Sequence, residues 1–205
     1  MVKASPLDLL SKNDVRIAQI IKSVGDYSIE FHKDSFESLI RSIVYQQLAG
    51  KAASAIFARF VKCYNPAFPT PKQILETSPQ ILHSKAGLSF RKIEYITDLS
   101  MKIYSGQLDL KSISDLGDKE VIAELMKVRG IGRWTTEMFL IFRLKREDVF
   151  PETDLGIKKA IQVMYGLPHL PTQEFIAEAS LKWKPYRSVA AWYLWKSLNS
   201  FTLIG

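Results

Sequence analysis

The residues whose types and spacing are most informative form the segment LMKVRGIGRWTTE, residues 125–137. Two glycines bracket one apolar residue, with an apolar helical run before them and a helix-start signal after them. Glycine permits turn conformations and a close approach of a ligand to the backbone. The unpaired N–H groups and positive dipole end of the following helix favour phosphate. The segment predicts a helix, a tight Gly-x-Gly turn and a second helix, an arrangement that can bind a nucleic-acid backbone, although a plain connection between helices can share this pattern. The contact residues expected are Arg129, Gly130, Ile131, Gly132, Arg133 and Thr135.

Composition limits the partners and sites that this chain can have. Its 205 residues include 28 Lys and Arg against 21 Asp and Glu, a net charge of +7. A basic balance fits a polyanionic partner. The single cysteine, Cys63, excludes an internal disulfide framework, an iron–sulfur cluster and a cysteine-rich zinc site, and the three histidines lack metal-ligand spacing. With no apolar signal core or membrane-length run, we expect an intracellular protein without a membrane partner, in the cytoplasm of a prokaryote or the nucleus of a eukaryote.

Apolar residues recur at helical spacing along almost the whole chain, and capping residues, prolines and glycines divide it into about ten helices. No convincing strand pair is present, so the sequence predicts an all-α fold. Helices are expected over 14–24, 52–64, 89–104, 133–144 and 185–199, with further starts at Asp34, Thr70, Ser78, Asp118, Asp154 and Thr172.

Four segments follow one another in an order that resembles the helix-hairpin-helix DNA glycosylases: SIVYQQLAGKAASAI, GIGRWTTEMFLIF, DVFPETDLGIKKAI and WKPYRSVAAWYLW. Within that superfamily they look most like the 3-methyladenine (alkylpurine) branch, and the resemblance covers residues 33–200. It implies a single glycosylase domain over 1–205, with two helical lobes around a cleft. The lobes are expected over 30–115 and over 116–205 plus the N-terminal helix.

The resemblance assigns catalysis to Asp154, because the family carries an aspartate downstream of the hairpin at the mouth of the base pocket. Breaking an N-glycosidic bond builds positive charge on the sugar. A nearby carboxylate stabilises that charge or orients the attacking water. On its position alone, Asp154 would be read as an ordinary N-cap, and it can serve in both roles.

The resemblance also implies a base pocket and the class of reaction. Branches that cut the strand carry a lysine where this chain has Trp134, and tryptophan has no amine to form a Schiff base. A monofunctional enzyme is therefore expected. Trp195 matches an aromatic that faces the flipped nucleotide, where a cationic alkylated purine would be attracted to its face. Tyr45 and Met138 are weaker pocket candidates, and plain core packing is the alternative for the aromatic residues of the last helix.

Gln46, Gln47 and Leu48 match the segment that inserts into the duplex to fill the gap left by the flipped base. Leu48 is the expected wedge within one position, and Gln47 is expected to contact DNA. A buried helix-end leucine is the alternative. The family also places a monovalent sodium or potassium ion between hairpin carbonyls and DNA, which on this chain implies Met126, Val128 and Gly130. No other cofactor is expected.

Two departures from the family pattern are visible. Arg129 stands where many members have proline, which leaves the turn less preset but adds a cation. The N-terminal mixed domain of some alkylpurine enzymes has no counterpart in this sequence.

The function expected is release of alkylated purines from duplex DNA by a monomeric glycosylase that leaves an abasic site. Two alternatives stay open. The first is a helix-hairpin-helix DNA-binding module without activity, against which Asp154 and Trp195 argue. The second is a glycosylase for oxidised or mismatched bases.

Overall fold

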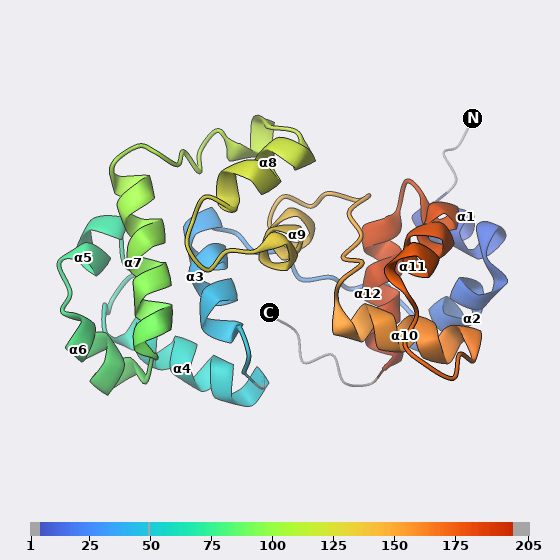
Figure 1. Ribbon diagram of the computed structural model, residues 1–205, viewed down its shortest axis with the longest axis horizontal. Coiled ribbons are helices and arrows are strands. Elements are labelled where there is room, and N and C mark those ends of the chain that lie inside the picture. The colour runs from blue at the N-terminus through green and yellow to red at the C-terminus, as the bar shows by residue number, and fades with distance from the viewer. Residues whose placement is uncertain (1–4, 49, 199–205) are drawn as a thin grey trace. The chain divides into compact units, whose positions relative to one another are not determined.

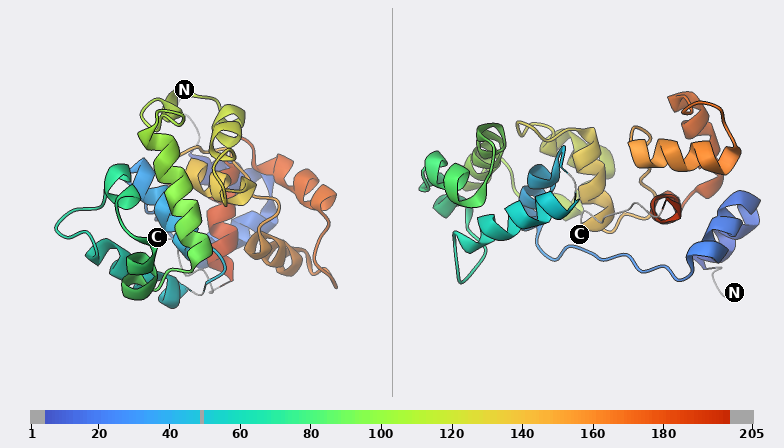
Figure 2. Two further views of the ribbon diagram at one scale, coloured as in Figure 1. Left: turned by 60° about the vertical axis from the view of Figure 1, so that its left-hand side comes forward. Right: turned by 90° about the horizontal axis from the view of Figure 1, so that it is seen from below.

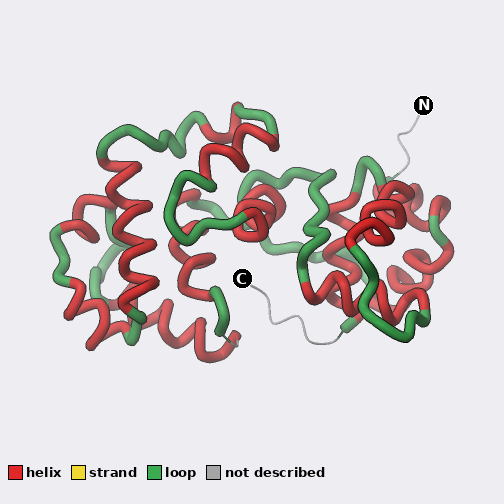
Figure 3. The backbone as a smooth tube through the Cα atoms, viewed as in Figure 1, coloured by secondary structure: helices red, strands yellow, loops and turns green. Residues whose placement is uncertain are grey.

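The computed structural model describes residues 5–48 and 50–198, and it shows helices and no strand in that part of the chain (Figures 1 and 3). The prediction of an all-α fold is confirmed for these residues. The chain divides into two compact units. Among the described residues, one unit joins residues 5–31 with residues 140–198, and the other consists of His32–Phe139. The division falls inside α9 (Arg133–Phe142) rather than after residue 115, so the hairpin lies in the His32–Phe139 unit.

The His32–Phe139 unit is built around α7, its longest helix. Helix α7 packs against α3 and α5, and α3 packs against α4; the views in Figure 2 show α3 and α7 side by side. Aromatic rings from α4 and the loop that follows it fill the core, with Phe57, Phe60 and Phe68 in mutual contact. The helices of this unit before α9 are α3 (Ser35–Tyr45), α4 (Gly50–Lys62), α5 (Pro71–Leu75), α6 (Pro79–Ile81), α7 (Phe90–Tyr104) and α8 (Asp118–Leu125).

The other unit is organised by α12, which is buried along nearly its whole length. Every residue from Ser188 to Trp195 is buried, as expected for a helix surrounded by protein. Helix α12 packs against α2 and α10, and α1 packs against α2. A buried hydrogen bond from Trp183 Nε1 to Asp14 Oδ2 (3.1 Å) joins the start of α2 to a later segment. The helices are α1 (Pro6–Asn13), α2 (Val15–Val24), α10 (Leu155–Tyr165), α11 (Gln173–Ser180) and α12 (Arg187–Ser197).

Local capping chemistry sets most helix starts where the sequence predicts them. In each case the side-chain oxygen of the cap accepts a backbone N–H from the first turn, which satisfies a group that the helix leaves unpaired. Glycines with positive φ, Gly25 and Gly166, end α2 and α10 as predicted. The predicted caps that make this contact are Asp34, Thr70, Ser78, Ser89, Asp154 and Thr172. Asp14, which was predicted as the first residue of its helix, caps α2 in the same way.

Some boundaries differ from the prediction. Helix α1 was not predicted, although Ser5 and Pro6 repeat the Ser–Pro start seen at Ser78. Helix α4 spans Gly50–Lys62 rather than 52–64, and α9 ends at Phe142 rather than residue 144. Asp118 is the first helical residue of α8, because Gly117 occupies the cap.

The last helix also starts later than predicted. It begins at Arg187 rather than residue 185, where tertiary contacts hold its start: Arg187 Nε donates to Asp148 Oδ1 (2.7 Å) and Ser188 N–H donates to Glu147 O (2.9 Å). The predicted end at Asn199 lies outside the described residues.

Candidate active site

The hairpin between α8 and α9 packs tightly against α7 at Gly130. This glycine has φ +79°, and a Cβ built on it would lie 2.1 Å from Tyr95 Cδ2. Both the backbone conformation and the close approach of the ring therefore require glycine here. Gly132 differs, because a Cβ there would meet no heavy atom within 4 Å. The open side of Gly132 leaves the backbone before α9 accessible, as the predicted phosphate grip requires.

A carboxylate on the same helix, α7, also anchors the hairpin. Asp98 Oδ2 accepts the backbone N–H of Arg129 (2.8 Å), and both Asp98 oxygens accept from Lys102 Nζ (2.7 Å). Burial acts to raise the pKa of Asp98, but the hydrogen bonds from Lys102 and Arg129 outweigh it and hold the pKa below its ordinary value. A proline at position 129 could not make this contact, because it has no N–H. The arginine thus gives the turn an anchor that proline would lack.

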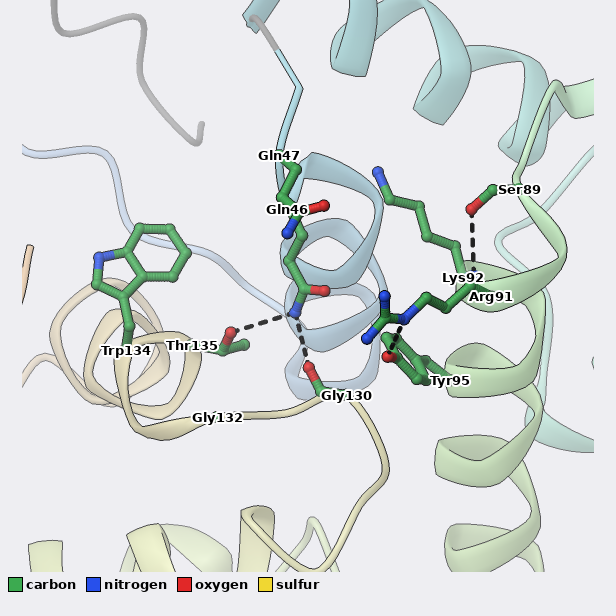
Figure 4. A pocket seen from close by; sticks show the side chains of 10 residues that line it. All are labelled: Gln46, Gln47, Ser89, Arg91, Lys92, Tyr95, Gly130, Gly132, Trp134 and Thr135. Atoms are coloured by element: carbon green, nitrogen blue, oxygen red, sulfur yellow. Dashed lines mark hydrogen bonds between the residues drawn. The ribbon is translucent and has the colours of Figure 1, made fainter. Parts of the chain in front are cut away.

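A cavity of about 470 Å³ opens beside the hairpin within the His32–Phe139 unit (Figure 4). None of its lining residues is acidic, and two are cationic, so the cavity suits an anionic ligand. Arg91 Nε donates to Tyr95 Oη (2.6 Å), which orients the guanidinium at the rim. Lys92 Nζ donates to the Val44 carbonyl at the end of α3, and burial lowers the pKa of Lys92. The lining residues are Gln46, Gln47, Ser89, Arg91, Lys92, Tyr95, Gly130, Gly132, Trp134 and Thr135.

The segment predicted to insert into DNA leaves the end of α3 along this cavity. Gln46 Nε2 donates to the Gly130 carbonyl (2.8 Å), as Figure 4 shows, and lies 3.4 Å from Thr135 Oγ1. Gln47 adopts φ +58°, a left-handed conformation that is unusual for a residue other than glycine. Leu48 is 38% exposed, so it is not the buried helix-end leucine that was the alternative reading.

Asp154 is held at the first turn of α10 by two donors to a single oxygen. Its Oδ1 accepts the backbone N–H of Ile157 (2.8 Å) and the indole N–H of Trp195 (2.8 Å). The N-cap reading of Asp154 is therefore correct, and its carboxylate also has a specific tertiary partner. Gly156 leaves room for this pair, because a Cβ there would lie 3.0 Å from both Asp154 Oδ1 and Trp195 Cδ1.

Trp195 is itself held in place by burial and by an aromatic neighbour. It is only 3% exposed, and its ring stacks on Phe142 with a centroid distance of 6.0 Å. In this arrangement the indole orients the Asp154 carboxylate, a contact that the sequence did not reveal. Its predicted place in the base pocket stays a prediction.

The remaining pocket candidates differ in exposure. Trp134 is partly exposed and lines the cavity of Figure 4. Tyr45 and Met138 are 8% and 3% exposed and are not among the residues that line it. Tyr45 instead packs on Phe57 and accepts from Arg41 Nη2 (3.2 Å). Their assignment to a base pocket stays a prediction.

The predicted site residues fall into two groups, one in each compact unit. Asp154 and Trp195 meet in the unit that contains α10 and α12. The hairpin, the segment after α3 and Trp134 belong to the His32–Phe139 unit.

Comparison with known proteins identifies the family. Residues 40–185, which include the hairpin and Asp154, match the family described as HhH-GPD superfamily base excision DNA repair protein. The chain belongs to this superfamily. DNA-3-methyladenine glycosylase 1 of Schizosaccharomyces pombe is 40% identical over 194 residues, which cover 92% of this chain and 84% of that protein.

Two solved structures share the fold of this HhH-GPD chain. The S. pombe 3-methyladenine DNA glycosylase in complex with abasic DNA has a TM-score of 0.87 at 37% identity, covering 94% of this chain and 96% of that one. A Bacillus halodurans DNA-3-methyladenine glycosidase has a TM-score of 0.84 at 35% identity, covering 97% and 91%. The resemblance seen in the sequence is confirmed.

The hairpin carbonyls expected to bind a monovalent ion are not equivalent in this HhH-GPD member. The Gly130 oxygen accepts from Gln46, and the Val128 oxygen accepts the N–H of Ile131 (3.1 Å). A carbonyl oxygen has two lone pairs, so each retains acceptor capacity, and carbonyl oxygens suit a hard cation. The described residues contain no group of three or more His, Cys, Asp or Glu placed to hold a metal ion.

No described helix is long and apolar enough to cross a membrane.

Several residues of this site were missed from the sequence. Arg91, Lys92 and Tyr95 line the cavity, Asp98 anchors the turn and Gly156 makes room for Asp154 and Trp195. Apart from Arg91, which donates to Tyr95 on its own helix, each of these residues meets a partner on another element, so no local motif reveals it. The one sequence feature that could have indicated the cavity is the pair of cations, Arg91 and Lys92, in the first turn of the helix capped by Ser89.

Proposed function

We propose that this protein is a monofunctional DNA glycosylase that hydrolyses the N-glycosidic bond of alkylated purines, of the 3-methyladenine type, in duplex DNA. The observation that carries the proposal is the Asp154 carboxylate, fixed by Trp195 and the start of α10. The 40% identity to DNA-3-methyladenine glycosylase 1 of S. pombe supports the substrate class.

The chemistry at Asp154 follows from the charge that develops in the reaction. As the bond between the sugar C1′ and the base nitrogen breaks, its electron pair leaves with the base and positive charge builds on the sugar. The Asp154 carboxylate stabilises that charge and orients the water that adds to C1′. Two donors on Oδ1 hold the carboxylate in place before the reaction starts, so little reorganisation is needed. The products are the free base and an abasic site.

The His32–Phe139 unit supplies the grip on DNA. The hairpin backbone and the cationic cavity beside it bind backbone phosphates, and Leu48, exposed after α3, fills the gap that a flipped base leaves. A damaged base pairs less well, so damage lowers the cost of flipping. We further propose that the protein acts as a monomer and that a sodium or potassium ion binds the carbonyls of Met126, Val128 and Gly130 with DNA.

Trp134 excludes one route to strand cleavage, because its side chain has no amine. Borohydride should therefore trap no covalent adduct between the protein and abasic DNA. A robust adduct would show that another amine of the chain performs lyase chemistry.

The test of the function is base release from methylated DNA, with the products identified chromatographically. Asp154→Asn should bind abasic DNA yet lose base release by roughly a hundredfold or more, since it removes the charge while asparagine can still cap the helix. Asp34→Asn is the matched control, because Asp34 caps α3 in the same way outside this site and should retain wild-type rates. A wild-type rate of base release in Asp154→Asn would refute the assignment of catalysis to Asp154.

The same experiment separates the alternatives. A DNA-binding module without activity would bind abasic DNA but release no base. A glycosylase for oxidised or mismatched bases would release those bases and not the alkylated purines.

A further inference from the structure

Gln46 forms a bridge between two segments that are both expected to touch DNA. It lies directly after α3 and directly before Gln47 and Leu48, the predicted insertion segment. Its side chain reaches Gly130 in the hairpin, 84 residues away in the chain. Because the Gly130 carbonyl can only accept, the amide nitrogen of Gln46 must face it. The side chain of Gln46 is thus directed at the hairpin, which leaves Gln47 and Leu48 as the residues that extend along the DNA side.

The surroundings hold this bridge in one arrangement. Lys92 on α7 donates to the Val44 carbonyl at the end of α3, and Asp98 on the same helix accepts the N–H of Arg129 in the hairpin. Helix α7 therefore braces both ends that Gln46 joins. The left-handed backbone of Gln47 is a strained conformation, which persists only where neighbouring contacts determine it. Gln46 supplies such a contact on its N-terminal side.

We propose that Gln46 is a positioning residue that sets the register of the insertion segment against the hairpin. The phosphate grip and the insertion segment then reach the duplex as one rigid unit, and binding at the hairpin is converted into insertion at the neighbouring base step. The proposal rests on the proposed function, since it concerns how that function's DNA site opens the base stack. It assigns Gln46 no contact with the reacting atoms.

The test is Gln46→Met, which keeps the length of the side chain and removes its donors. The matched control is Gln107→Met, because Gln107 is an exposed glutamine of the same unit outside the cavity. The probe is a duplex with an abasic-site analogue and 2-aminopurine stacked beside it, whose fluorescence rises when insertion unstacks the neighbouring base. At saturating protein, wild type and Gln107→Met should give the full rise. Gln46→Met should bind this duplex with nearly unchanged affinity. Its 2-aminopurine fluorescence should rise roughly tenfold more slowly than with wild type, or most of the rise should be lost.

A second readout distinguishes positioning from a general loss of structure. Gln46→Met should release a paired alkylated base roughly tenfold more slowly than wild type. The defect should shrink when the same base is placed opposite a mismatch, because flipping then costs less. Equal losses on both duplexes, or an unchanged fluorescence rise, would overturn the proposal, as would the absence of any rise with wild type. If wild type unstacks the probe but releases no alkylated base, the proposed function fails while the role of Gln46 in insertion stands.

Discussion

The hydrogen bond between Trp195 and Asp154 makes a quantitative prediction about catalysis. Trp195→Phe removes the indole N–H that lies 2.8 Å from Asp154 Oδ1 and keeps an aromatic ring beside Phe142. A hydrogen bond to a charged group contributes about 1.5–3 kcal/mol. At about 1.4 kcal/mol per factor of ten in rate, its loss should slow base release by roughly tenfold to a hundredfold.

The control for lost packing lies one turn earlier in the same helix. Trp192 is 1% exposed and Trp195 is 3% exposed, so both substitutions disturb the core to a similar extent. The Trp192 indole nitrogen has no hydrogen-bond partner among the described residues. Trp192→Phe should therefore lower Tm about as much as Trp195→Phe while leaving the rate of base release near wild type.

Single-turnover base release from methylated DNA measures the rates, and thermal unfolding measures stability. In the Asp154→Asn background, Trp195→Phe should add less than about a threefold effect, because the indole acts through the carboxylate. Equal rate losses in Trp192→Phe and Trp195→Phe would refute the reasoning, as would full additivity of Trp195→Phe with Asp154→Asn.

Three further substitutions, one of them with a matched control, test single contacts. Gly130→Ala should destabilise the fold by roughly 1–3 kcal/mol and weaken binding to abasic DNA, since its Cβ would lie 2.1 Å from Tyr95 at positive φ. Gly132→Ala, with an open Cβ position, should change neither quantity much, and equal effects would contradict this account. Asp98→Asn should cost about 1–2 kcal/mol at pH 7, measured by denaturant unfolding. Because the pKa of Asp98 is lowered in the folded state, that difference should begin to shrink as the pH falls below the ordinary value of 3.8 and should vanish only once the pH passes below the lowered pKa of the folded state. A difference that stayed constant throughout this fall in pH would refute the assignment. Gly156→Ala should slow base release without weakening abasic-DNA binding, because it crowds the Asp154 carboxylate; an unchanged rate would count against that carboxylate's role.

The helices themselves were largely predictable from the sequence. A cap such as Ser89 or Asp154 accepts backbone N–H groups two or three residues away, so the start of a helix depends on a few neighbouring residues that the sequence shows directly. The exceptions have tertiary causes. The last helix starts at Arg187 because its first residues bind Asp148 and Glu147, far earlier in the chain, and no local pattern signals such contacts.

For the site, the sequence by itself determined the helical class, the Gly-x-Gly turn and the aspartate at the start of a helix, because these depend on residue type and short spacing. Only the tertiary structure decided what holds them in place. Gln46 meets Gly130 across 84 residues, Trp195 meets Asp154 across 41 and Asp98 meets Arg129 across 31. A hydrogen bond needs its two atoms about 3 Å apart, and for groups so distant in the chain only the packing of helices provides that approach.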